Sequence, residues 1–377
     1  MKIAFLSLTK NIGGGELSLL SILSSCNCDF TVYPSEKGQF TEILDQKEYK
    51  YRLFSVGRYI STLSSNSGKV KTIFSLLTYS IVFLFHIRRE GSDVIYLNNY
   101  KSFYIGYIIS FFIKSRFVCH IRDGFSRGRV EKILLKRFDK INAMFFVNSK
   151  FTLDTVNATY SPRDIEVIYN GIEISEGDDV NYTSFHSKKS EYHIGIFSRI
   201  SRVKGQLEFL ESISSIADYK IIVHLYGDMV HGEESYFDLV KIKCQELISS
   251  GIKVIMHGYT NEPIEMMKKM DIVVLPTVNP EPFGRVIIEA QMLRKIVIAN
   301  DLGGPKEIIS NGINGFLVQG SEKNSYAKII NYIFSNWHNM DIIANNARNS
   351  VIDNYTKKAM VDKVNSRLRS YEDHTYK

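Results

Sequence analysis

The chain has 377 residues, is 44% hydrophobic and carries a formal net charge of +7. This length and apolar content exclude a disordered chain and predict two globular domains rather than one. The charge is unevenly spread, because residues 1–170 hold 23 basic and 14 acidic side chains whereas residues 171–377 hold 24 and 26. We therefore expect the first half to meet an anionic partner, such as a membrane surface, nucleic acid or a phosphorylated substrate.

The first half of the chain alternates between strand and helix patterns. Residues 2–8 form the first predicted strand, and three glycines at 13–15 lead into a helical pattern. This order is the usual opening of a doubly wound parallel sheet. Further strands are predicted at 30–33, 94–97, 116–120 and 143–147.

Two segments of the first half, 72–87 and 103–113, are unusually apolar. Both are shorter than the roughly 20 residues that span a bilayer. We expect them to be buried helices; the alternative is a helix partly immersed in the membrane interface between its basic flanks.

Four cysteines in a chain of this length do not make a disulfide framework. Cys26 and Cys28 have no second pair at zinc-ligand spacing, so reduced thiols are expected and a metal site is not. The N-terminal segment has one charge before a short apolar run and lacks a small-residue cleavage site, which predicts a strand rather than a signal peptide. The expected location is cytoplasmic.

The second half repeats the alternation with great regularity. We predict a first domain at 1–171, a polar linker at 172–190, a second domain at 191–355, and a terminal helix from about 356 that packs back on the first domain. The expected fold class is α/β, with two doubly wound parallel sheets. Strands are predicted at 192–198, 220–225, 252–257, 271–275, 295–299 and 315–318, with helices near 205–217, 233–249, 262–270, 285–293 and 304–310.

Charged residues follow several of these strands, where parallel sheets bind their ligands. Arg199 and Lys204 flank a loop that opens a helix, an arrangement suited to a diphosphate. Gly284 begins another helix and permits close backbone approach. Glu281 and Glu289 place two carboxylates near that helix start, where they can accept hydrogen bonds from sugar hydroxyls.

Together these motifs resemble the retaining glycosyltransferases of the GT-B architecture, in particular glycosyltransferase family 4. The matching segments are Arg199 to Lys204, the Glu-x7-Glu pattern of Glu281 and Glu289, Gly-Gly-Pro at 303–305, the glycine turn at 13–15, His-Ile-Arg-Asp from His120, and Tyr-Asn-Gly-Ile at 169–172.

The resemblance implies two Rossmann-like domains facing across a cleft and a sugar transfer that retains the anomeric configuration. The donor would be a nucleotide sugar, with a UDP-sugar favoured over a GDP-sugar. Arg199 and Lys204 would bind the diphosphate, Glu289 the ribose, and Glu281 the donor sugar. The other implied donor contacts are Gly14, Gly15, Tyr259, Phe283, Gly284 and Arg285. The implied catalytic set is His120, which would face the reacting centre, with Glu281, Arg199 and Lys204.

No cofactor is expected, because the nucleotide sugar is a substrate. The sequence contains no Asp-x-Asp segment, so a metal-chelated diphosphate is not indicated. A front-face path, in which the donor phosphate takes the acceptor proton, follows from the resemblance alone.

Basic residues concentrate at 114–137 and alternate with apolar ones. This composition suits an anionic bilayer or a lipid-diphosphate acceptor, and no nucleic-acid recognition motif is present. We therefore expect a peripheral enzyme at the inner face of the membrane, adding sugar to a lipid-linked glycan of bacterial surface polysaccharide. The candidate acceptor or membrane residues are Arg122, Arg127, Arg129 and Lys132.

Three other functions stay open from sequence. One is a nucleotide-sugar epimerase of related fold, and another is a non-catalytic nucleotide-sugar-binding subunit at the membrane. The third is a nicotinamide oxidoreductase, although the glycines at 13–15 do not match Gly-x-Gly-x-x-Gly because residue 18 is a serine.

Overall fold

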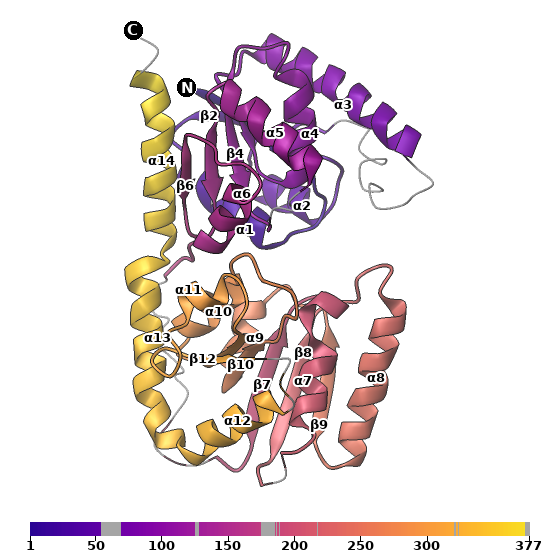
Figure 1. Cartoon of the computed structure of the whole chain (residues 1–377), viewed down its shortest axis with the longest axis vertical. Helices are drawn as coiled ribbons and strands as arrows, with labels where there is room; N and C mark the ends of the chain where they lie inside the picture. The colour runs from indigo at the N-terminus through magenta and orange to yellow at the C-terminus, as the bar shows by residue number, and fades with distance from the viewer. Residues whose placement is uncertain are drawn as a thin grey trace. The chain divides into compact units, whose positions relative to one another are not determined.

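The computed structural model describes residues 1–53, 69–124, 128–174, 185, 187, 189–216, 218–319, 322 and 324–373, with side chains absent from the description at 69–74 and 372–373 (Figure 1). The chain divides into two compact units, one made of Met1–Asn170 with Lys358–Lys377 and the other of Gly171–Lys357. Most of the predicted linker, 175–184 together with 186 and 188, lies outside the described residues.

The first unit is built on a six-stranded parallel sheet in the order β2-β1-β3-β4-β5-β6. Parallel neighbours need a crossover connection, and helices supply it here. The elements are β1 Lys2–Ser7, α1 Gly14–Leu23, β2 Asp29–Pro34, α2 Gln39–Gln46, α3 Lys69–Glu90, β3 Val94–Leu97, α4 Tyr100–Ile109, β4 Arg116–Ile121, α5 Arg129–Lys140, β5 Met144–Val147, α6 Lys150–Asn157 and β6 Ile165–Val167.

The last helix, α14 (Lys357–Asp373), contributes its buried face to this first unit. Met360, Val361, Val364 and Leu368 are buried in the same apolar cluster as residues of β1 and α1. At its far end, the Tyr371 hydroxyl donates to the carbonyl of Phe117 over 3.0 Å. The core on this side of the first sheet is therefore completed by residues that begin 190 positions after Asn170, where the first segment of the unit ends; α14 is the yellow helix of this unit in Figure 1.

The second unit repeats the design with a sheet in the order β12-β11-β10-β7-β8-β9, again parallel throughout. The predicted α/β class and the paired parallel sheets are confirmed. Its elements are β7 Tyr192–Phe197, η3 Arg202–Lys204, α7 Gln206–Ile213, β8 Ile221–Tyr226, α8 Glu234–Ser249, β9 Lys253–Gly258, α9 Pro263–Lys268, β10 Ile272–Leu275, α10 Arg285–Met292, β11 Ile296–Asn300, α11 Pro305–Ile308, β12 Phe316–Val318, α12 Ser325–Ser335, η4 Trp337–Asn339 and α13 Met340–Asn354.

Three features differ from expectation. The three-residue strand β6 was not predicted, because so short a half-buried segment has no clear hydrophobic period. The expectation that all cysteines are reduced is wrong for one pair, since Cys26 and Cys28 form a disulfide; their Cα atoms lie 5.4 Å apart, within disulfide reach. The apolar segment expected at 72–87 extends over the longer helix α3, and only one of its faces is buried.

Three histidines form a hydrogen-bonded ladder across β7, β8 and β9. The Nδ1 of His193 lies 3.0 Å from the Nε2 of His224, whose own Nδ1 lies 2.9 Å from the Nε2 of His257. Burial, followed by the neighbouring His193, His257 and Lys253, lowers the pKa of His224 to about 4. His224 is therefore neutral in the folded protein at neutral pH, and its ring can donate one hydrogen bond and accept another.

This ladder predicts a loss of stability in acid. The unfolded chain protonates His224 near pH 6.5 and the folded chain near pH 4, so the unfolded state binds more protons between these values. The free energy of unfolding should fall by up to about 3 kcal/mol as the pH drops from 6.5 to 4. Urea denaturation across this range measures it. His224→Phe should reduce the dependence of the unfolding free energy on pH. His231→Phe, at an exposed position, should leave that dependence unchanged. An equal pH dependence in wild type and His224→Phe would contradict the assignment of the acid sensitivity to His224.

Candidate functional site

The loops that follow β7, β8 and β9 are tied to one another by backbone hydrogen bonds. Ile200 N–H donates to the carbonyl of Asp228 over 2.8 Å, and Gly227 N–H donates to that of Gly258 over 2.8 Å. The carboxylate of Asp228 also accepts from Tyr259 N–H at 3.0 Å. Asp228 was not singled out from the sequence, although it follows a predicted strand as the other candidates do.

Lys204 and Glu281, predicted separately as donor ligands, meet in the structure. Lys204 Nζ donates to Glu281 Oε2 over 2.7 Å, and both side chains are about one-fifth exposed. Glu281 reaches this position because its loop is bonded to the next one: Gly304 N–H donates to the Glu281 carbonyl over 2.7 Å. The pair therefore presents an ammonium and a carboxylate side by side, with access to solvent.

Two glycines allow these loops to approach so closely. Gly205 has φ +71°, and a Cβ there would lie 2.0 Å from the Pro276 carbonyl oxygen. Gly303 has φ +73°, and a Cβ there would lie 2.4 Å from the Glu281 carbonyl oxygen. Any other residue would be strained by its backbone angle and would push the neighbouring loop away.

Glu289 lies on α10, one turn after Arg285. Arg285 Nε donates to Glu289 Oε1 over 2.6 Å, and Arg285 Nη1 donates to the Gly171 carbonyl over 3.2 Å. Burial raises the pKa of Glu289, and the Arg285 guanidinium opposes that effect. The Glu289 side chain is 12% exposed, so protein neighbours cover most of its surface.

The remaining predicted donor residues differ in their exposure to solvent. Arg199 is exposed and Tyr259 is 49% exposed, so both side chains can reach a ligand. The Phe283 side chain is buried against Tyr355, with ring centroids 5.8 Å apart. Gly284 precedes α10 with φ +94°.

In the first unit, Gly15 makes room for Arg122. Gly14 and Gly15 begin α1, and a Cβ on Gly15 would lie 3.1 Å from Arg122 Cδ. Arg122 follows β4, and its guanidinium donates to Asn98 Oδ1 at 2.9 Å and to Asn170 Oδ1 at 3.2 Å. The structure thus holds a buried cation against the glycine turn.

His120 lies in β4, next to the strand's last residue, and its ring is buried. Its side chain is 1% exposed, and Nδ1 lies 2.5 Å from the Tyr96 hydroxyl and 3.1 Å from Arg122 Nη2. Burial, and then the Arg122 charge, holds the pKa of His120 well below its usual range, so the ring is neutral. Nε2 of His120 has no hydrogen-bond partner among the described residues, and the expected contact of this ring with the reacting centre stays a prediction.

The predicted acceptor residues on α5 are surface groups. Arg129 and Lys132 are exposed on the first turn of that helix, and Arg127 lies outside the described residues. Between Met1 and Asp373, the described histidine, cysteine and acidic side chains include no group of three or more that could hold a metal ion.

Comparison with known proteins gives two matches to family models. The model "Glycosyltransferase Family 4" matches residues 51–176, and "Glycosyl transferases group 1" matches residues 182–350, so together they match more than half of the chain.

Individual relatives are distant. The Escherichia coli UDP-Gal:alpha-D-GlcNAc-diphosphoundecaprenol alpha-1,3-galactosyltransferase is 21% identical over 97% of this chain and 95% of its own length. The Staphylococcus aureus poly(ribitol-phosphate) alpha-N-acetylglucosaminyltransferase is 25% identical over 62% of this chain and 45% of its own. HepE of Anabaena, solved in complex with UDP, is 25% identical over 98% of this chain and 100% of its own, with a TM-score of 0.79.

The contacts of His120 predict a stabilising role. In His120→Phe the buried Tyr96 hydroxyl would lose the ring nitrogen that it contacts, and leaving a buried donor unpaired costs about 1–3 kcal/mol. Urea denaturation should show that loss. The matched variant His231→Phe, at a fully exposed position in the second unit, should leave the stability unchanged and so tests whether replacing any histidine has the same effect. Unchanged stability in His120→Phe would contradict the buried network.

Proposed function

We propose that this chain, which belongs to the glycosyltransferases of group 1 and family 4, moves a sugar from a UDP-sugar to a lipid-linked glycan acceptor. The transfer would retain the anomeric configuration and use no metal ion. The observation that carries the donor half is the pairing of Lys204 with Glu281 over 2.7 Å beside the loop that starts α10.

The chemistry of this pairing fits a leaving diphosphate and a sugar. Departure of a nucleoside diphosphate builds negative charge, which fixed cations and free helix N–H groups stabilise. Lys204 and Arg199 would supply the cations, and the first turn of α10 would supply the N–H groups. Glu281, held by Lys204, keeps a second carboxylate oxygen that can accept from hydroxyls of the donor sugar.

Glu289 would bind the nucleotide ribose. Its Oε1 already accepts from Arg285 over 2.6 Å, and this bond orients the carboxylate. Oε2 could then accept hydrogen bonds from the ribose hydroxyls. Both glutamates are paired with cations, which favours binding roles over nucleophilic ones. A front-face path, with the donor phosphate taking the acceptor proton, needs no enzymic nucleophile.

The relatives support the substrate classes of the proposal. The E. coli relative is named for UDP-galactose and a diphosphoundecaprenol acceptor, and HepE was solved with UDP. These names favour uridine over guanosine in the donor and a lipid diphosphate in the acceptor.

Thermal unfolding with UDP, GDP, ADP and NAD, each with and without EDTA, tests the donor assignment. A ligand at about 100 times its Kd should add about 2.7 kcal/mol of stability. We expect a melting shift with UDP that EDTA does not change. A shift only with NAD, or with none of the four, would overturn the donor assignment, and one that EDTA abolishes would overturn metal independence.

Lys204→Met should weaken UDP binding about 10- to 100-fold, because a charge-assisted contact contributes roughly 1.5–3 kcal/mol. Lys243→Met is the matched control, since Lys243 pairs with Glu246 over 3.0 Å on α8, away from these loops. Calorimetric titration with UDP measures both. Equal loss of affinity in the two variants, or none in Lys204→Met, would argue against a diphosphate contact.

The same enzyme is proposed to work at an anionic membrane surface. Within the part of the chain that the structure describes, no helix has the length and apolarity to cross a bilayer. Helix α3 nevertheless exposes a stripe of apolar side chains four residues apart, with Leu77 46%, Ile81 68% and Phe85 62% accessible. Its opposite face is buried through Tyr79, Phe83 and Ile87.

This stripe continues onto the segment after α4. Phe111 and Phe112 are more than half exposed, and Arg88 at the end of α3 donates to the Phe112 carbonyl over 2.9 Å. Basic residues adjoin it: Arg88 and Arg89 are exposed at the end of α3, Lys114 is exposed two residues after Phe112, and the Arg137 guanidinium lies 3.9 Å from the centroid of the Phe111 ring. An apolar surface edged with cations is suited to the interface of an anionic bilayer.

Co-sedimentation with phosphatidylglycerol vesicles at low salt tests this surface. The double variant Ile81→Asp and Phe85→Asp should reduce vesicle binding at least about tenfold. It removes apolar area that the bilayer would bury, and it adds negative charge that the anionic lipid repels. Ile242→Asp, on exposed α8 of the second unit, is the control and should bind as wild type does. A wild type that ignores the vesicles would refute the membrane proposal while leaving the UDP result unaffected.

A further inference from the structure

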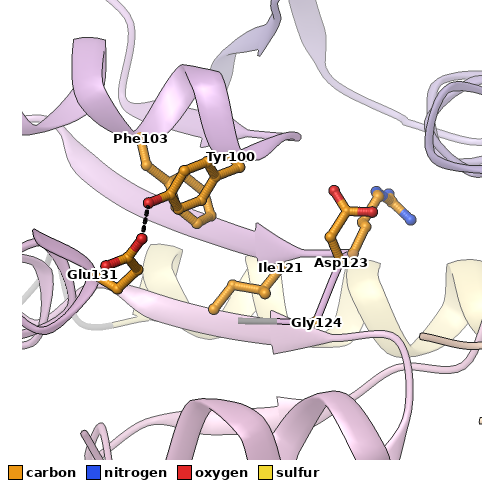
Figure 2. A pocket seen from close by; sticks show the side chains of 7 residues that line it. Tyr100, Phe103, Ile121, Asp123, Gly124 and Glu131 are labelled. Atoms are coloured by element: carbon orange, nitrogen blue, oxygen red, sulfur yellow. Dashed lines mark hydrogen bonds between the residues drawn. The ribbon is translucent and has the colours of Figure 1, made fainter. Parts of the chain in front are cut away.

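A pocket of about 190 Å³ opens within the first unit, at the carboxyl end of β4. Helices α4 and α5 supply its sides, and the loop that follows β4 supplies the rest (Figure 2). No side chain of the donor loops takes part in it. Its lining residues are Tyr100, Phe103, Ile121, Arg122, Asp123, Gly124 and Glu131.

One wall of the pocket is aromatic and apolar. Tyr100 and Phe103 come from α4 and Ile121 from the end of β4, and the two aromatic rings lie 6.3 Å apart at a steep angle. Such a wall suits the C–H face of a sugar ring, which is the apolar side of an otherwise polar molecule.

The polar groups of the pocket are mostly acceptors. Glu131 Oε1 accepts from the Tyr100 hydroxyl over 2.6 Å, and that hydroxyl accepts from Tyr104 over 2.9 Å. Figure 2 shows Glu131 and Asp123 on opposite sides of Ile121. Two carboxylates at the two ends of an apolar wall match a ring whose rim carries hydroxyl donors.

The single cation of the lining is engaged elsewhere. Arg122 donates to Asn98 and Asn170, and its Nη2 lies 3.1 Å from His120 Nδ1. With one arginine held by these neighbours against two carboxylates, the pocket favours neutral or aminated rings over anions.

We propose that this pocket binds the terminal sugar ring of the acceptor, not its phosphate, with Tyr100 and Phe103 against the ring face and Glu131 and Asp123 on its hydroxyls. The inference rests on the proposed function, because it names the acceptor chemistry of that transferase. A ring held here lies next to Arg122, the cation that the structure presents at the end of β4.

Saturation-transfer NMR of the full chain without donor tests the pocket. The probes are the methyl glycosides of glucose, galactose, mannose and N-acetylglucosamine, and inorganic pyrophosphate. At least one glycoside should bind the wild type. Tyr100→Phe and Glu131→Gln should each weaken that binding at least about fivefold, since each removes a polar partner. The matched controls Tyr332→Phe and Glu246→Gln, both in the second unit, should not.

The melting shift with UDP is recorded on every variant, which separates this inference from the donor assignment. A UDP shift in Tyr100→Phe equal to wild type shows that the variant is folded and that only the pocket was altered. If no glycoside binds the wild type, or if binding survives both pocket variants, the pocket assignment is wrong even when UDP binds. Pyrophosphate binding that strengthens in Glu131→Gln would also overturn it, because it would mark a phosphate site.

Discussion

Every strand of both sheets runs parallel, and this one constraint places the chemistry of the protein. Parallel strands deliver all their following loops to the same edge, where side chains distant in sequence become neighbours. In the second unit the loops are then fixed by their own backbones, as when Gly304 N–H donates to the Glu281 carbonyl over 2.7 Å. Lys204 and Glu281 meet across 77 positions because of this arrangement.

Hydrophobic alternation was enough to predict every described strand except β6, because a strand buried on two faces is a short apolar run between loops. The donor residues followed from the same pattern, since each lies just after such a run. His120 shows what that pattern leaves open. The pattern predicted His120 near the end of a strand, where the structure has it, but it could not show that the ring is buried against Tyr96 and Arg122.

Other features depended on register and packing that one sequence does not contain. The histidine ladder requires His193, His224 and His257 to face the same side of three strands, and their spacing in sequence gives no sign of it. The pocket brings Glu131 to Tyr100 from a different helix. Helix α3 was expected to be buried because its composition is apolar; composition cannot show that a helix has one face in the core and another in solvent.

Helix α14 has a consequence for how the protein is made. Its residues Met360, Val361, Val364 and Leu368 complete the core that begins with β1, yet they follow the whole second unit in the chain. During synthesis the first sheet therefore keeps an apolar face exposed to solvent while about 190 further residues leave the ribosome. The second unit is contiguous and can close by itself in that interval. The first unit is thus synthesised first but completes its core last. Its exposed apolar face needs protection from aggregation until α14 has been made.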